Sequence, residues 1–149
     1  MNRLVSILLL LGMSLWSQPN ARSADNPPRF CAVDIVIDSG EKPLAAYQAV
    51  FSIGDGSAKI VGIEGGESPA FRAAPYYDPK AIQHERVIVA AFCTDKSERL
   101  PTGKTRVSTI HLQTSAATKL RFELKIQVAA DDQGNPIEVR ATAIERQAK

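Results

Sequence analysis

Residues 44–66, LAAYQAVFSIGDGSAKIVGIEGG, constrain the fold more than any other stretch of the chain. Apolar side chains recur at every second position in its first half, at Tyr47, Ala49, Phe51 and Ile53. A period of two is what a half-buried β-strand requires. The segment 54–57 contains two glycines, which tolerate positive φ, and an apolar pattern resumes before Gly65 and Gly66. The stretch therefore predicts two strands that form a hairpin, ended by the double glycine.

Further segments show strand patterns, namely residues 31–38, 86–92, 105–114, 119–128 and 137–145. Alternation is complete in 119–128, which predicts one solvent face and one core face with Val128 on the core side. Residues 86–92, RVIVAAF, are apolar on both sides after the arginine and predict a central strand covered on both faces. Short strands separated by turn signals, without a long helix, predict an all-β fold, an antiparallel β-sandwich.

The first 24 residues have the pattern of a secretory signal peptide. Arg3 precedes an apolar run of 13 residues, 4–16, and a polar tail leads to Ala24. That run is short against the roughly 20 residues of a membrane-spanning helix, although a retained anchor is the alternative. The expected organisation is a signal peptide at 1–24, a lead-in at 25–30, one domain at 31–145 and a tail at 146–149. We expect an exported protein, periplasmic or extracellular, without membrane insertion after cleavage.

The charge of the chain argues against two classes of partner. Arg3 and Arg22 lie in the predicted signal, so the formal charge of +2 falls to zero in the mature chain, with 16 basic and 16 acidic residues. The basic residues are spread singly and form no cluster. Nucleic acid and anionic membrane surfaces are therefore not expected as main partners.

Cys31 and Cys93 are the two cysteines of the chain. An even count in an exported protein predicts a disulfide, and the two residues lie at ends of predicted strands, which can meet. The alternative is a pair of buried free thiols, because cysteine packs as a small apolar side chain.

The order of these elements is similar to that of a known family. The matching segments are PLAAYQAVFSI, KIVGIEGG, RVIVAAF, LPTGKTRVSTIHLQ and LKIQVAADDQGNPI. Over most of residues 31–144 they resemble the cohesin domain, a jelly-roll β-sandwich related to carbohydrate-binding modules. The resemblance implies a binding role with a protein partner, dockerin-like or other, in the envelope or outside the cell.

Residues 65–86 form a long connection that contains the motif PYYDP. Connections of this length are often functional, and adjacent Tyr76 and Tyr77 would offer rigid aromatic surface to a ligand. We name Tyr76, Tyr77, Asp78 and His84 as candidate ligand-binding residues. The structural alternative is that the tyrosines seal the edge of the sandwich while Asp78 caps a short helical turn at 79–83.

Other polar residues do not match a catalytic or metal-binding pattern. His84 and His111 lack ligand partners at helical or strand spacing, and the acidic residues Asp55, Asp131 and Asp132 lie in glycine turns without calcium-loop spacing. No nucleophile or phosphate-binding motif occurs. We therefore expect a non-catalytic module without metal or cofactor. A polysaccharide-binding module that uses the loop tyrosines is the second hypothesis, and a glycoside hydrolase-like enzyme is the third.

Overall fold

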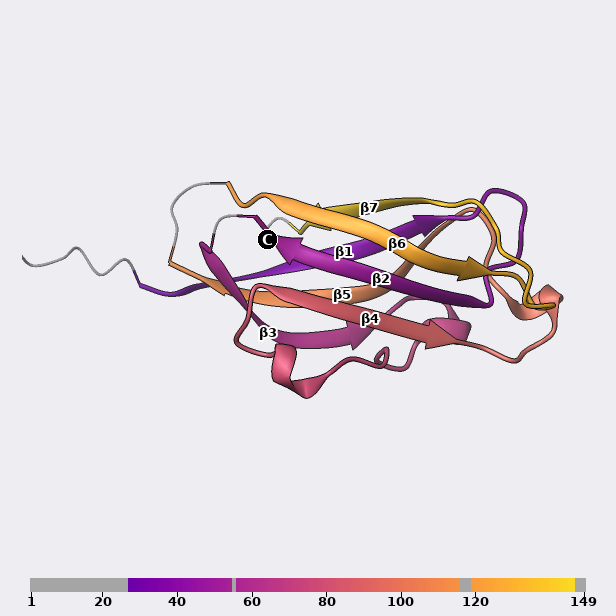
Figure 1. Ribbon diagram of the computed structural model, residues 1–149, viewed down its shortest axis with the longest axis horizontal. Coiled ribbons are helices and arrows are strands. Elements are labelled where there is room, and N and C mark those ends of the chain that lie inside the picture. The colour runs from indigo at the N-terminus through magenta and orange to yellow at the C-terminus, as the bar shows by residue number, and fades with distance from the viewer. Residues whose placement is uncertain (1–26, 55, 116–118, 147–149) are drawn as a thin grey trace, which may run out of the picture.

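The computed structural model describes residues 27–54, 56–115 and 119–146. The predicted signal peptide, Asp55 and most of the predicted tail lie outside these residues. The described residues form seven β-strands and three short 3-10 helices (Figure 1). The strands are β1 (Arg29–Asp38), β2 (Ala46–Ile53), β3 (Ala58–Gly65), β4 (Arg86–Phe92), β5 (Lys104–Thr114), β6 (Phe122–Ala130) and β7 (Arg140–Glu145). The predicted all-β class is confirmed.

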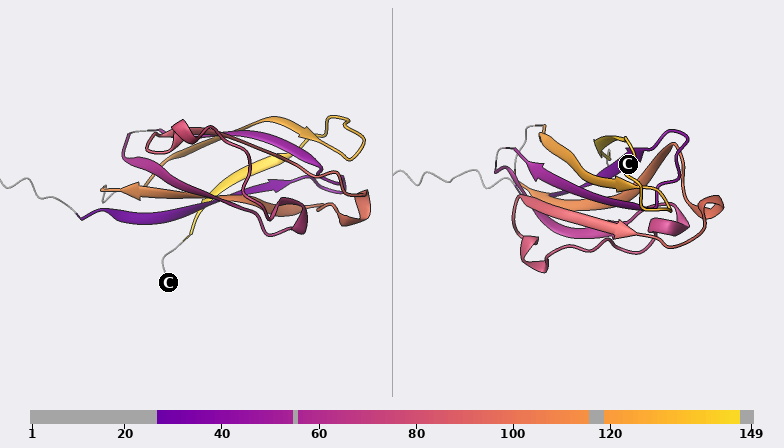
Figure 2. Two further views of the ribbon diagram at one scale, coloured as in Figure 1. Left: turned by 90° about the horizontal axis from the view of Figure 1, so that it is seen from below. Right: turned by 45° about the vertical axis from the view of Figure 1, so that its right-hand side comes forward.

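The strands form two antiparallel sheets that lie face to face (Figure 2). The four-stranded sheet has the order β3-β5-β1-β7, and the three-stranded sheet has the order β4-β2-β6. Successive strands thus alternate between the sheets along the chain. The predicted hairpin is therefore wrong, because β2 and β3 lie in different sheets. A period of two shows that a strand has one buried face, but it is the same whether the next strand lies beside it or across the core.

The core lies between the sheets and consists of the inward side chains of both. Its largest fully buried members are Tyr47, Phe51, Phe71, Ile35, Ile37, Leu44, Ile60, Ile110, Leu112, Val33, Val87 and Val89. Most of these come from the predicted strands. Phe71 comes instead from the long connection after β3, so that segment belongs to the core as well.

Three β-bulges shift the alternation of buried residues. Val107 is skipped in the pairing of β5 with β1, Val61 in that of β3 with β5, and Gln127 in that of β6 with β2. Each extra residue exchanges the two faces of the strand beyond it. Val128, predicted on the core side, is consequently 50% exposed, whereas Ala129 is buried.

Strand β4 is an edge strand of the three-stranded sheet, so the prediction of a central, doubly covered strand is wrong. Val87 and Val89 point into the core, while Ile88 and Phe92 on the other face are 39% and 63% exposed. The strand is apolar on both sides because its outer side contributes to an exposed apolar surface.

Residues 66–85 close one side of the sandwich between the edge strands β3 and β4 (Figures 1 and 2). Ile60 of β3 exchanges backbone hydrogen bonds with Gln83 and His84, and Tyr76 forms a bridge with Ala90 of β4. The segment contains the helices η1 (Pro69–Phe71) and η2 (Pro79–Ala81). This connection thus satisfies backbone groups on the outer edges of two strands, which would otherwise be open to pairing with other chains.

The free energy of unfolding should depend on pH in the alkaline range because of Tyr47. Its hydroxyl donates to the carbonyl oxygen of Val107 at 3.2 Å, and burial raises its pKa to about 12, with a smaller opposing effect of Ser108. The neutral hydroxyl therefore stabilises the fold fully below about pH 10, the usual pKa in an unfolded chain, and this contribution is lost as the pH rises to about 12.

We expect the free energy of unfolding to fall by about 2 to 3 kcal/mol between about pH 10 and pH 12 from this group alone. Denaturant unfolding of the wild type and of Tyr47→Phe across this range measures the effect. The variant lacks the ionising group and should show a flatter dependence. Equal slopes for the two proteins would contradict the assignment.

Candidate functional site

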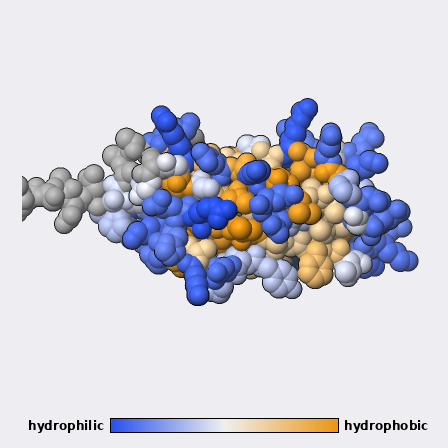
Figure 3. All heavy atoms as spheres, viewed as in Figure 1, coloured by the Kyte–Doolittle hydropathy of each residue, from blue (hydrophilic) through white to orange (hydrophobic). Residues whose placement is uncertain are grey.

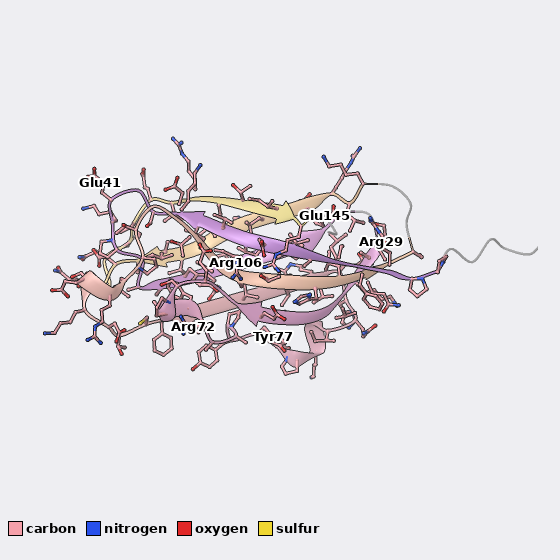
Figure 4. The ribbon with its side chains drawn as sticks, turned by 180° about the vertical axis from the view of Figure 1, so that it is seen from behind. Arg29, Glu41, Arg72, Tyr77, Arg106 and Glu145 are labelled. Atoms are coloured by element: carbon pink, nitrogen blue, oxygen red, sulfur yellow. The ribbon has the colours of Figure 1, made fainter. Side chains whose placement is uncertain are left out.

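Tyr76 and Tyr77 point in different directions from the segment that covers β4. Tyr76 is 71% exposed, and its ring lies nearly parallel to that of Phe92, with 6.1 Å between the centroids and 10° between the planes. Tyr77 is half-buried against the core, at the margin beside β3 (Figure 4). The backbone of Tyr76 pairs with Ala90 in both directions, at 2.7 and 2.9 Å, and this extended bridge turns adjacent side chains to opposite faces. Only Tyr76 is thus presented to a ligand.

Asp78 and His84 do not join Tyr76 in a common site. The Asp78 carboxylate accepts the backbone N–H of Lys80 at 2.9 Å, so Asp78 caps η2 as the structural alternative predicted. The side chain of His84 is exposed, and its backbone carbonyl accepts the N–H of Ile60. In the part of the chain that the structure describes, no hydrogen bond or ring contact connects either side chain with Tyr76.

An apolar surface covers the outer side of the three-stranded sheet. We call it the apolar face and define it by Ala46, Gln48, Val50, Tyr76, Ile88, Ala90, Phe92, Val128 and Ala130. Figure 3 shows hydrophobic atoms over β2, β4 and β6, interrupted by hydrophilic side chains, with further hydrophilic atoms at both ends. Four of its members, Tyr76, Ile88, Phe92 and Val128, are large side chains between 39% and 71% exposed. Contiguous exposed apolar surface of this kind marks interaction sites.

The pairing register of β2 with β4 and β6 places the residues of the apolar face side by side. Val50 of β2 pairs with Ile88 on one side and Lys125 on the other, and Gln48 pairs with Ala90 and Val128. The Gln48 side-chain amide nitrogen donates a hydrogen bond to the Gln127 side-chain oxygen at 2.7 Å. These two polar side chains, which lie among apolar ones, thus provide a hydrogen-bond partner for each other. Among the described residues of these three strands, Lys125 lies beside Val50, and Arg86 and Glu123 flank Ser52 one row further toward the end at which β4 and β6 begin.

Sequence reasoning named only Tyr76 of this surface and missed Ile88, Phe92 and Val128. The apolar residues on both sides of 86–92 were the signal for the first two. That pattern fits an exposed binding surface as well as a covered strand, and the sequence does not distinguish them. Val128 was assigned to the core because the bulge at Gln127 has no recognisable local signature.

The outer face of the four-stranded sheet carries a polar cluster that is paired within the chain, beside the exposed apolar side chains Phe30 and Ile144. Arg146 donates two hydrogen bonds to Asp34, at 2.7 and 2.9 Å, and Thr109 donates a third at 2.8 Å. Arg106, in the middle of this face in Figure 4, donates to Gly65 and Thr109. Burial alone would raise the pKa of Asp34, but these hydrogen bonds and the arginine charges outweigh it and lower the pKa. The cluster fastens the chain after β7 onto β1 and β5.

His111 lies on this same outer face and is partly exposed, as the sequence predicted. Its Nε2 atom is 3.1 Å from a carboxylate oxygen of Glu64, which is largely exposed. Neither residue lines the hollow beside Asp38 and Arg140 or the hollow between β6 and residues 134–139. A lone histidine beside an exposed carboxylate has no nucleophile to activate, so the pair gives no reason to assign catalysis.

The predicted disulfide between Cys31 and Cys93 is wrong, and both thiols are free. Cys31 pairs with Leu112 near the beginning of β1, whereas the N–H of Cys93 donates to Ala45, just before β2. These positions lie at opposite ends of the sandwich, about 25 Å apart if measured along the eight-residue β2. Ends of strands can meet only when the strand directions bring them to the same end. Burial, with a smaller contribution from Glu145, raises the pKa of the Cys31 thiol.

Two hollows of the described structure are not lined by Tyr76. A hollow of about 420 Å³ between β6 and residues 134–139 is lined mainly by apolar side chains, and one of about 600 Å³ lies beside Asp38 and Arg140. Among the described residues, no three side chains of His, Cys, Asp or Glu are placed to hold a metal ion. The same residues contain no helix with the length and hydrophobicity to cross a bilayer.

No family model, no curated protein and no solved structure matches this chain. The evidence for a function is therefore the geometry of the two outer faces. One carries a hydrogen-bonded charge cluster beside the exposed side chains of Phe30 and Ile144, and the other carries the four exposed side chains of Tyr76, Ile88, Phe92 and Val128.

Proposed function

We propose that the protein is an exported, non-catalytic binding module that engages a protein partner through the apolar face. The observation that carries this proposal is the contiguous set of exposed large side chains Tyr76, Ile88, Phe92 and Val128 on one side of the sandwich. The signal-peptide pattern of residues 1–24 supports export of the protein. A jelly-roll topology of cohesin type is the fold that we assign, supported by strands that alternate between the sheets along the chain. A dockerin-like protein is the partner that the cohesin resemblance implies.

The composition of the apolar face favours a protein over a glycan. Protein interfaces have an apolar, aromatic centre with few charges and a polar rim, and the apolar face has this arrangement. Ile88, Val50 and Val128 form much of its centre, and aliphatic side chains offer neither a stacking plane nor a hydrogen bond to a sugar hydroxyl.

Polysaccharide binding is the second candidate, and one observation favours it. The rings of Tyr76 and Phe92 are both exposed and nearly parallel, with 10° between their planes. Such a pair could carry a sugar ring on each aromatic plane. This candidate predicts that only Tyr76 and Phe92 matter for binding, whereas a protein partner also needs the aliphatic positions on β4 and β6.

A matched pair of substitutions tests the proposed function. Val128 and Ile144 are both β-branched, both lie on edge strands and both are 50% exposed, but Ile144 lies on the outer face of the other sheet. The mature protein, Val128→Asp and Ile144→Asp are immobilised and exposed to proteins of the source envelope and culture fluid. Captured proteins are identified and their affinities are then measured with purified components.

We expect one specific protein to bind the wild type and Ile144→Asp, and to bind Val128→Asp at least about tenfold more weakly, since an aspartate in an apolar interface leaves a buried, unpaired charge. Polysaccharide retention assays with Tyr76→Ala and Phe92→Ala run in parallel. Retention of the wild type on a polysaccharide, lost in these two variants but kept in Val128→Asp, would replace the proposal by the second candidate. Equal loss in both aspartate variants would contradict a role of the apolar face.

A further inference from the structure

The two ends of the apolar face carry opposite charge. At the end where β4 and β6 begin, residues 84–86 and 119–125 contain four basic and two acidic side chains: Arg86, Lys119, Arg121 and Lys125 against Glu85 and Glu123. At the other end, residues 94–100 and 131–136 contain two basic and four acidic side chains: Lys96 and Arg99 against Asp95, Glu98, Asp131 and Asp132. A contact between Ser97 and Asp132 at 2.9 Å shows that these last two loops lie together.

The row of the apolar face formed by Gln48, Ala90 and Val128 has no charged side chain, and Lys125, which pairs with Val50, is the first charge toward the basic end. The outward positions from Ala46 to Val50 and from Ile88 to Phe92 are apolar or glutamine, and so are Val128 and Ala130. A surface that is neutral in its centre, net basic at one end and net acidic at the other is complementary to itself after a two-fold rotation that reverses the strand direction. Such a rotation places the basic end of one copy over the acidic end of the other.

We propose that a second copy of this chain covers the apolar face, in an antiparallel two-fold dimer of the three-stranded sheets. This inference rests on the proposed function and names the partner of the same surface. Sheets that pack face to face commonly lie about 10 Å apart with their strands nearly aligned. The dimer then has four stacked sheets, with the two three-stranded sheets in the centre and their apolar faces in contact.

The size of the apolar face sets the strength of the dimer. The face is four strand positions wide, because Tyr76 extends the sheet beyond β4, and about five residues long, from Ala46 to Val50 on β2. At about 4.8 Å per strand and about 3.4 Å per residue it covers about 330 Å² in each copy, or about 650 Å² in the dimer. Stable dimers bury more, so we expect a weak, reversible dimer with a dissociation constant on the order of 100 micromolar.

Sedimentation velocity over about 1 to 500 µM measures this association directly. The wild type and Ile144→Asp should pass from monomer to dimer with increasing concentration. Phe92→Asp and Val128→Asp should remain monomeric, with circular dichroism spectra and thermal midpoints showing that they are folded. A wild type that stays monomeric throughout would overturn the inference, and so would a dimer that Ile144→Asp disrupts equally.

A charge exchange tests the antiparallel arrangement. Arg86→Glu with Lys125→Glu makes both ends acidic, and Asp95→Lys with Asp132→Lys makes both ends basic; all four side chains are exposed. Each double variant alone should dimerise about tenfold more weakly because like charges then meet, and an equimolar mixture should restore association to near the wild-type value. A mixture no stronger than its components would overturn the arrangement.

The outcomes separate this inference from the proposed function. A monomeric wild type that still captures another protein, with loss in Val128→Asp, overturns the dimer and leaves the proposed function standing. A dimer with the expected variant pattern supports both. A monomer that captures nothing counts against both.

Discussion

Alanine at Gly66 should lower the free energy of unfolding by about 3 kcal/mol or more. A Cβ atom on Gly66 would overlap the carbonyl oxygen of Arg106 and lie 2.8 Å from the Cα of Val107, both of which are backbone. Backbone cannot rotate away as a flexible side chain can, so β5 or the segment after β3 would have to move. The φ angle of Gly66 is not in the left-handed region. The glycine is needed for close approach of two chain segments and not for a turn.

Gly54 provides the matched control for this substitution. No atom lies within 4 Å of a Cβ built on Gly54, and its φ is also outside the left-handed region. Gly54→Ala should therefore change stability by less than about 1 kcal/mol, with a stabilising sign if the unfolded chain loses freedom. Urea unfolding of both variants measures the difference. If Gly66→Ala were as stable as Gly54→Ala, the close approach of Gly66 to the backbone of β5 at Arg106 and Val107 would be wrong.

Phe71→Ala should cost about 3 to 5 kcal/mol, the usual range for truncating a buried phenylalanine. The Phe71 ring is 2% exposed and meets the Tyr47 ring edge-on, with 5.3 Å between the centroids and 76° between the planes. Removing it leaves a cavity under residues 66–85. Because this segment also holds Tyr76 against Ala90, we expect the Tyr76 amide to exchange with deuterium much faster in the variant.

Phe92→Ala is the control for Phe71→Ala, because it removes the same atoms from a side chain that is 63% exposed. Its effect on the free energy of unfolding should be below about 1 kcal/mol. Its effect on dimerisation should be large, since Phe92 lies on the apolar face. Similar unfolding free energies for the two alanine variants would contradict the placement of Phe71 in the core.

The two faces of this sandwich have different energetic roles. On the four-stranded sheet the charges of Asp34, Arg106 and Arg146 are hydrogen-bonded to one another or to the backbone of the same molecule. On the three-stranded sheet the exposed side chains are apolar, and covering them would lower the free energy by about 25 cal/mol for each Å² of apolar area removed from water. The charge cluster of the four-stranded sheet is therefore satisfied within the monomer, and the apolar face, which has four of the six exposed large hydrophobic side chains among the described residues, benefits more from a partner.

Local sequence was sufficient wherever the physics is local. The alternation in residues 47–53 and 119–126 predicted strands with one inward face, because side chains of a strand point to opposite sides in turn. Asp78 followed by Pro79 predicted a capped helical turn, because an N-cap carboxylate and a proline at the first position act within four residues. The exposure of one tyrosine and the packing of the other also follow from adjacency in an extended segment.

The sequence by itself determined the all-β class and the approximate strands, and it offered the cap of Asp78 on a helical turn as one of two interpretations of residues 65–86. Only the tertiary structure decided which strands pair, that Cys31 and Cys93 lie at opposite ends, and that Ile88, Phe92 and Val128 face outward together. The reason is that a period of two reports which side of a strand is apolar. It carries no information on the neighbouring strand, on bulges such as that at Gln127, or on whether an apolar side is covered by the same chain or by another.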